Sequence, residues 1–152
     1  MIKDTGFVLL SIDNSNITNK IFSCISQAIS DNPYKQICVF NSANNRVCND
    51  RVPILHINQS KFFYGNLVVF DTASILFAKN FPNIDTIFLY ATNIFWNSNS
   101  YARYFDTLEL FGTKNLQFIA ADQRIYDIYN NCWKQPIGIC EDFNYDTIKQ
   151  YI

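Results

Sequence analysis

Residues 66–90 constrain the fold of this 152-residue chain more than any other stretch, because they contain a complete strand–helix–strand unit. The apolar run Leu67-Val68-Val69-Phe70 ends in Asp71-Thr72, and a short amphipathic stretch follows. Pro82-Asn83 then interrupts the chain before a second apolar run begins at Ile84. Two continuous apolar strands joined through a helix are typical of a parallel sheet covered on both faces. Open sheets of this kind bind ligands at the carboxyl ends of their strands, so the unit also predicts where a site would lie.

Apolar runs elsewhere in the chain extend the same alternation of strands and helices. We expect strands at 7–12, 36–40, 52–57, 67–70, 84–90, 116–120 and 137–140, and helices at 17–29, 73–79, 101–111, 123–132 and 145–151. This order predicts a doubly wound, mainly parallel α/β sheet of about six or seven strands, a Rossmann-like fold with right-handed crossovers. No linker or internal repeat divides the chain, so we expect a single domain over residues 1–152.

Charge and hydropathy exclude several kinds of partner. The formal net charge is −1, and no run of Lys or Arg occurs, so we expect no nucleic-acid partner. No apolar run approaches the roughly 20 residues of a membrane-spanning helix, so we expect no membrane span. The amino terminus carries no basic segment leading into an apolar core, as secretory signals do, and we therefore expect a cytoplasmic protein.

The cysteines and glycines argue against a metal site and a dinucleotide cofactor. The five cysteines include no Cys-x-x-Cys pair and the chain has one histidine, which disfavours zinc and predicts reduced, unpaired thiols. The first strand-to-helix turn, Ile12-Asp13-Asn14-Ser15-Asn16, lacks the glycines that let a backbone approach a pyrophosphate. No Walker A sequence occurs either. We therefore expect no metal and no cofactor.

Polar residues that follow the predicted strands are the candidates for ligand binding. They are Asp13, Asn14, Asp71, Thr72, Thr92, Asn93, Asp122 and Glu141, together with His56 inside the third predicted strand. Asp71 could accept hydrogen bonds from sugar hydroxyls or bind a metal, or else Asp71 or Thr72 could cap the following helix. Asp122 and Glu141 could form a catalytic carboxylate pair, or each could cap a helix and interact with its dipole. His56 could be a general base or a structural histidine. Because carboxyl ends of parallel strands share an edge, we expect Asp13, Asp71, Thr92 and Asp122 to meet there.

Residues 91–100 combine aromatic side chains with amides. Phe95 and Trp96 lie between Asn93 and Asn97, a combination that suits a sugar, because sugar CH groups stack on aromatic rings while amides bind hydroxyls. The same pattern also fits a surface loop held by apolar anchors. We expect the aromatic side chains of this loop to be exposed and Trp96 to anchor a ligand or partner.

Four segments resemble the amino-terminal, acceptor-side half of GT-B-type glycosyltransferases. They are Leu-Val-Val-Phe-Asp-Thr at 67–72, Ile-Phe-Leu-Tyr-Ala-Thr-Asn at 87–93, Phe-Ile-Ala-Ala-Asp-Gln-Arg-Ile-Tyr at 118–126 and Pro-Ile-Gly-Ile-Cys-Glu-Asp-Phe at 136–143. The resemblance implies a carbohydrate or nucleotide sugar as ligand. In that family the second domain holds most of the nucleotide sugar, and nothing in this chain resembles that domain. The resemblance therefore implies a second domain or subunit, and no transfer by this chain alone. Cys140-Glu141-Asp142 departs from the Asn-Gly-Val usual at that place.

Three functions are compatible with these residues. The first is a glycosyltransferase-like domain without a donor-binding half, which binds a carbohydrate or a protein partner. The second is a small α/β enzyme acting on a nucleotide or sugar phosphate, with Asp13, Asp71 and Asp122 as its acids. The third is a non-catalytic interaction protein, because a fold alone does not determine a function.

Overall fold

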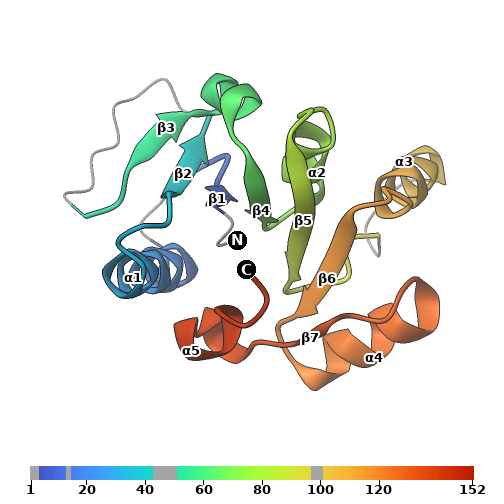
Figure 1. The fold of residues 1–152 in the computed structure, drawn as a ribbon. Helices are drawn as coiled ribbons and strands as arrows, with labels where there is room; N and C mark the ends of the chain where they lie inside the picture. The colour runs from blue at the N-terminus through green and yellow to red at the C-terminus, as the bar shows by residue number, and fades with distance from the viewer. Residues whose placement is uncertain (1–3, 13–14, 43–50, 97–100) are drawn as a thin grey trace.

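The computed structural model describes residues 4–12, 15–42, 51–96 and 101–152, in which seven strands form one sheet (Figure 1). The strand order is β3-β2-β1-β4-β5-β6-β7, and every neighbouring pair is parallel. The strands are β1 (Thr5–Val8), β2 (Ile37–Asn41), β3 (Ile54–His56), β4 (Gly65–Val69), β5 (Ile84–Ala91), β6 (Leu116–Ala120) and β7 (Gly138–Ile139). The helices are α1 (Asn16–Asp31), α2 (Thr72–Ala78), α3 (Tyr101–Phe111), α4 (Gln123–Cys132) and α5 (Tyr145–Ile148), with 3-10 helices η1 (Ile57–Phe62) and η2 (Glu141–Phe143). The predicted α/β class is confirmed.

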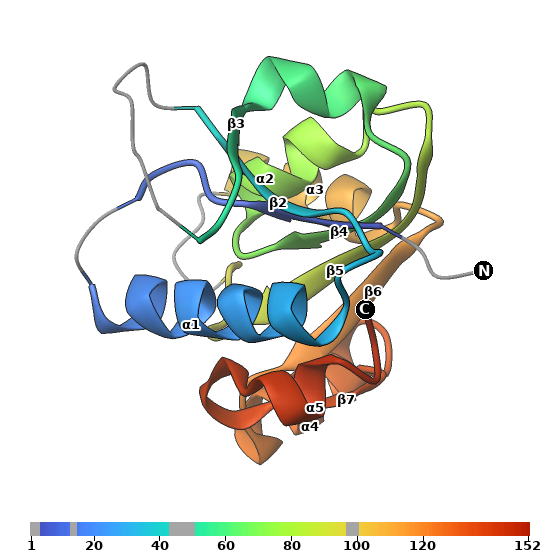
Figure 2. The same ribbon diagram turned by 60° about the vertical axis from the view of Figure 1, so that its left-hand side comes forward.

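Helices cover both faces of the sheet, as the two ribbon views show (Figures 1 and 2). The helix α1 and the carboxyl-terminal segment with η2 and α5 pack on one face, where Phe7 and Val68 belong to their core. The other face carries η1, α2, α3 and α4, and its core includes Val8 and Val69. Successive strand residues thus alternate between two buried layers, which explains why the strands are continuous apolar runs.

The strand order reverses direction between β1 and β4, which lie side by side at the centre of the sheet. From β1 the chain passes through α1 to β2 on one side, and from β4 it passes through α2 to β5 on the other. The helices that follow β1 and β4 therefore diverge onto opposite faces. A crevice is expected outside the carboxyl ends of two strands at such a switch point.

The helix η1 was not predicted, and it shortens the third strand. The expected strand 52–57 ends at His56, because the His56 ring Nδ1 accepts a hydrogen bond from Asn58 N–H at 3.2 Å and caps η1. The first strand begins at Thr5 and ends at Val8 instead of spanning 7–12. By contrast, α3, β6 and α4 have the predicted bounds.

None of the helices in the described ranges is both long enough and apolar enough to cross a membrane.

Candidate functional site

The carboxyl edge of the sheet carries a crevice made of two adjoining hollows. The first, of about 210 Å³, lies between the ends of β1 and β4 and the start of α1. The second, of about 410 Å³, lies between the ends of β5 and β6, α1 and η2. Ile17 and Thr92 line both hollows, so the two adjoin. We call their union the carboxyl-edge crevice.

Three of the predicted site residues line this crevice. Asp71 borders the first hollow, Asp122 borders the second, and Thr92 lies between them. The prediction that these residues meet at one edge is confirmed. Asp13 and Asn14 lie outside the described residues.

Hydroxyl-bearing residues line the first hollow together with aliphatic side chains and one aromatic ring. Ser11, Ser15 and Thr18 line it together with Phe70 and Asp71. Ser15 also caps α1, because its Oγ accepts a hydrogen bond from Thr18 N–H at 3.3 Å. The first hollow thus offers several groups that both donate and accept hydrogen bonds.

An ion pair closes one side of the second hollow. Lys20 on α1 contacts the Asp142 carboxylate in η2, and both side chains line the hollow with Asp122. Lys20 is the single cation among the described residues that border the crevice, whereas three carboxylates, those of Asp71, Asp122 and Asp142, border it. The crevice is therefore acidic in balance.

Buried Tyr90 holds the turn that carries Asp142. Its hydroxyl donates to the Cys140 carbonyl at 2.8 Å and accepts from Phe143 N–H at 3.2 Å. Burial raises the pKa of Tyr90 from 10.0 to about 12, so the phenol keeps its proton into the alkaline range. Asp142 and Phe143 have φ of 57° and 51°, a left-handed conformation that is uncommon for a bulky residue such as phenylalanine. Residues with such uncommon backbone angles are concentrated at functional sites, so the 140–143 turn is part of the candidate site.

Both predicted aspartates cap helices. Asp71 Oδ1 accepts from Ser74 N–H at 2.6 Å at the start of α2, and Asp122 Oδ1 accepts from Ile125 N–H at 2.8 Å at the start of α4. The capping interpretation is confirmed for both residues. Each cap uses one carboxylate oxygen, and the second oxygen, Oδ2, accepts no hydrogen bond from the described residues. That oxygen is available to a ligand.

Four other candidates lie away from the crevice or only beside it. His56 is exposed at the far end of the sheet, where it caps η1, which agrees with a structural role. Thr72 is the first residue of α2. Asn93 is exposed, and its carbonyl accepts from the Tyr129 hydroxyl at 3.2 Å. Glu141 is exposed in η2 and lines neither hollow.

The expected exposure of the aromatic side chains in the described part of the 91–100 loop is wrong. Phe95 and Trp96 are half-buried and pack on the core of the α2–α4 face. The Trp96 ring centroid lies 5.1 Å from that of Tyr129, 5.3 Å from Trp133 and 6.1 Å from Phe111. Trp96 thus closes the space between α3 and α4, because both helices direct aromatic side chains toward it. A ligand contact by Trp96 stays a prediction.

Sequence reasoning missed Lys20, Tyr90 and Asp142. Lys20 lies on the exposed side of a helical pattern, so nothing in the sequence relates it to the chain 122 residues later. A tyrosine inside an apolar strand does carry a signal, because a buried hydroxyl needs a hydrogen-bond partner. The sequence thus indicates that the Tyr90 hydroxyl forms a hydrogen bond with another segment, but it does not indicate which segment.

No three His, Cys, Asp or Glu side chains gather as metal ligands in the part of the chain that the structure describes. Cys24, Cys38, Cys132 and Cys140 are free thiols, and Cys48 lies outside the described residues. No protein-family model matches the sequence, and no curated protein matches it.

Proposed function

We propose that this chain is a Rossmann-like binding domain whose carboxyl-edge crevice takes an uncharged, hydroxyl-rich group of a carbohydrate. We further propose that it works beside a donor-binding domain or subunit, as the resemblance to GT-B-type glycosyltransferases implies. The observation that carries the proposal is the lining of the crevice, where hydroxyl groups and carboxylates outnumber cations at the topological switch point.

This lining suits a sugar in three ways. The free carboxylate oxygens of Asp71 and Asp122 can accept hydrogen bonds from sugar hydroxyls. The hydroxyl of Thr92 between them can donate or accept. The ring of half-buried Phe70, in the first hollow, offers an apolar surface for the CH face of a sugar ring.

An enzyme acting on a nucleotide or sugar phosphate fits the same crevice less well. A phosphate would meet three carboxylates and one cation, Lys20, which is already paired with Asp142. Dinucleotide-binding proteins place an acidic ribose ligand after the second strand. Here Asn41 and Ser42 occupy that place, and both donate to carbonyls of the chain after β1, at Leu9 and Leu10. We therefore favour the neutral ligand.

The test compares neutral sugars with their phosphates. Purified protein labelled with ¹⁵N is titrated with glucose, galactose, mannose and N-acetylglucosamine, and then with the corresponding 1-phosphates and UDP-sugars. We expect at least one neutral sugar to shift amide signals around Thr92, and Thr92→Val to weaken that binding at least fivefold. Thr86→Val, at the opposite end of the same strand, is the control and should bind normally.

Three results would contradict the proposal. If no neutral sugar shifts the signals of the crevice, the interaction-protein alternative is favoured. Tighter binding of sugar phosphates than of neutral sugars would favour the small enzyme. Steady transfer from a nucleotide sugar by this chain alone would show that it needs no second domain.

A further inference from the structure

The outward side of α2 and α3 is apolar. The two helices contact each other on one face of the sheet, where Figure 1 shows them side by side. Five large apolar side chains on these helices are between 36% and 52% exposed: Leu76, Phe77, Tyr104, Phe105 and Leu108. We call these five side chains the α2–α3 surface.

The helix α2 contains no charged residue, although one of its sides faces solvent. Its sequence is Thr-Ala-Ser-Ile-Leu-Phe-Ala, and the buried side chains are those of Ser74, Ile75 and Ala78. Leu76 and Phe77 lie on the other side of the helix and stay exposed. A helix at the surface of a monomer usually directs charged and polar residues outward, whereas a helix that is apolar on all sides is buried on all sides. The composition of α2 therefore indicates that a second surface packs on it.

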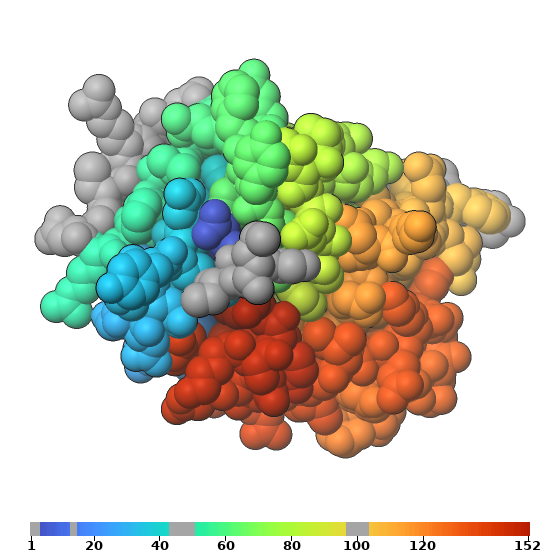
Figure 3. Space-filling view, viewed as in Figure 1, coloured from blue at the N-terminus to red at the C-terminus, as the bar shows by residue number. Residues whose placement is uncertain are grey.

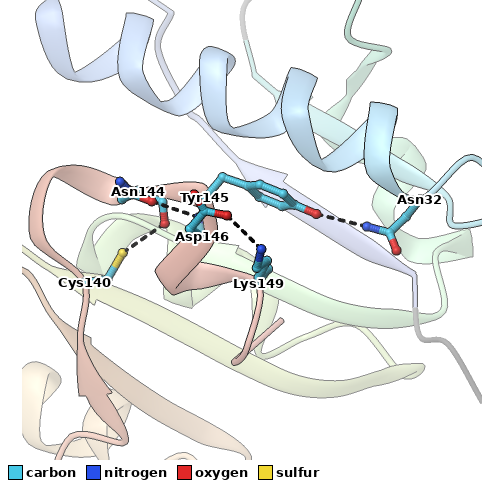
Figure 4. Close-up of polar contacts among 6 residues, drawn as sticks. All are labelled: Asn32, Cys140, Asn144, Tyr145, Asp146 and Lys149. Atoms are coloured by element: carbon cyan, nitrogen blue, oxygen red, sulfur yellow. Dashed lines mark hydrogen bonds and ion pairs between the residues drawn. The ribbon is translucent and has the colours of Figure 1, made fainter.

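On the opposite face of the sheet, the carboxyl-terminal segment of the chain covers α1. Figure 3 shows this segment lying between α1 and α4. The Tyr145 ring reaches from α5 to the end of α1, where Asn32 Nδ2 donates to its hydroxyl at 3.1 Å (Figure 4). On α1 only Ile17 is a strongly exposed apolar side chain, and it lines the crevice. The α2–α3 surface, by contrast, stays exposed after the described elements have packed.

The exposed apolar area of this surface is close to what the centre of a dimer interface needs. A large apolar side chain presents about 200 Å² when fully exposed, so the five side chains present on the order of 400 Å² at their exposed fractions. A standard interface buries about 800 Å² per partner, and about 65% of this area is apolar in homodimers. The α2–α3 surface therefore supplies most of the apolar area of a standard interface.

The charges beside this surface are of opposite sign on the two helices. Lys79 ends α2, whereas Asp106 and Glu109 are exposed on α3. Lys79 Nζ lies 3.3 Å from Glu109 Oε1, so the two charges are at the same level along the helices. A twofold axis parallel to the helices places α2 of one copy on α3 of a second copy, and these opposite charges then meet twice. Nucleic acids and anionic lipids need a surplus of cations, which the described side chains of these helices do not offer.

We propose that the α2–α3 surface is the interface of a homodimer, in which a second copy of this chain packs its own α2–α3 surface over the first. The apolar side chains of α2 in each copy pack against those of α3 in the other copy. Lys79 of each copy then lies beside Glu109 of the other, at the rim of the apolar centre. The proposal does not depend on the sugar ligand, because none of the five side chains lines the crevice.

The test measures the mass of the protein in solution by sedimentation velocity between 5 and 200 µM. We expect the mass to approach twice 17.7 kDa at the upper concentration. Phe77→Glu and Leu108→Glu should each weaken dimerisation at least tenfold, because each places a charge in the apolar centre of the interface. Tyr34→Glu is the matched control, since it replaces a 95% exposed aromatic side chain in the turn after α1, and it should dimerise as the unmodified protein does.

A charge exchange provides the test even if a glutamate in the apolar centre prevents folding. Lys79→Glu places like charges opposite each other in the dimer, so it should weaken dimerisation at least fivefold. The double variant Lys79→Glu/Glu109→Lys restores opposite charges and should dimerise within twofold of the unmodified protein. The melting temperature and the far-ultraviolet circular dichroism of each variant show whether it is folded.

Four results would overturn the proposal. The first is a protein that keeps the mass of one chain at 200 µM. The second is a dimer that survives both glutamate substitutions within twofold. The third is a double exchange that dimerises no better than Lys79→Glu alone. The fourth is a monomeric protein that binds phosphatidylcholine vesicles and loses this binding in Phe77→Glu, which would assign the α2–α3 surface to a membrane instead.

Discussion

The two edges of the sheet use polar side chains in opposite ways. At the carboxyl edge, Asp71 and Asp122 each accept a hydrogen bond from the first turn of a helix, and Tyr90 fixes a turn through two hydrogen bonds. At the amino edge, Thr5 and Asn66 lie side by side in the sheet with a buried atom that has no partner. The other two unpartnered buried atoms of the described residues are Ser74 Oγ, in the first turn of α2 near the carboxyl edge, and Trp133 Nε1, just after α4. The contrast between the edges therefore concerns the polar residues of the strands and the strand ends.

This difference follows from the direction of the strands. In a parallel sheet each helix begins near the carboxyl end of the preceding strand, so polar residues there satisfy the helix amides. The helices α1, α2 and α4 each begin after the carboxyl end of a strand, so a polar side chain buried at the amino end of a strand has none of these helix amides to cap. A polar side chain at the carboxyl end of a strand is therefore weak support for a ligand site, because capping already explains it. A buried polar atom without a hydrogen-bond partner at the amino edge is not explained by capping.

The substitution with the largest expected effect is Trp96→Ala, which tests whether the Trp96 ring stabilises the fold. Trp96→Ala removes a half-buried ring that contacts Tyr129 and Trp133, so we expect a loss of about 3 kcal/mol in the free energy of unfolding. Urea denaturation measures it. A variant as stable as the unmodified protein would show that the ring is not part of the core.

Tyr90→Phe should have the next largest effect. The substitution leaves the Cys140 carbonyl and the Phe143 amide without their buried partner, at a cost of about 2 kcal/mol. Tyr126→Phe, whose hydroxyl accepts a hydrogen bond from exposed Gln135, is the control and should cost much less. Equal losses in the two variants would mean that the 140–143 turn does not depend on Tyr90.

Alkaline pH should destabilise the folded state through the same buried groups. Burial raises the pKa of Cys24 and Cys38 from 9.0 to about 12 and that of Tyr90 from 10.0 to about 12. The unfolded chain loses these protons first, so their contribution is complete below pH 9 and falls as the pH rises toward 12. Each group contributes a slope of up to about 1.4 kcal/mol per pH unit. Urea denaturation with reductant from pH 8 to 11 measures the fall, and Tyr90→Phe should make it shallower only above pH 10. A flat profile would contradict the burial of these groups.

The sequence predicted the regular elements well and the local exceptions poorly. The helical spacing of Tyr101–Phe111 and Gln123–Cys132 and the apolar run Leu116–Ala120 gave the observed bounds. The helix η1 was missed because its residues 58–61 are polar and without helical periodicity, and because a histidine caps it. Short-range sequence patterns determine the bounds of α3, β6 and α4. The presence of η1 depends instead on the geometry of one side chain, that of His56.

The candidate site was predictable only in part, for a related reason. Asp71, Thr92 and Asp122 follow strands, so topology alone brings them together. Asn66 looked like an ordinary polar residue before an apolar run. Its Oδ1 atom is buried without a hydrogen-bond partner, which the sequence does not show because it depends on how α1 and α5 pack beside Asn66.

Two substitutions of Asp122 distinguish helix capping from ligand binding at the carboxyl edge. Asp122→Ala should cost about 1 kcal/mol, because α4 loses its N-terminal cap, while Asp122→Asn should cost only a few tenths, since asparagine caps equally well. The asparagine variant keeps the cap but changes the charge of the free oxygen. Weaker sugar binding in this variant at unchanged stability would assign Asp122 a second role; unchanged binding would leave it a cap alone.

Thr5→Val should have the smallest effect, and in the opposite direction. Valine has nearly the shape of threonine, and it removes a fully buried hydroxyl that has no partner, so we expect a gain of up to about 1 kcal/mol in the free energy of unfolding. The backbone hydrogen bond from Thr5 N–H to the Gln36 carbonyl is unaffected. Denaturation of this variant beside Asp122→Ala compares the two edges directly. A loss of stability would mean that the Thr5 hydroxyl is satisfied in solution, and the contrast between the edges would then rest on Asn66 alone.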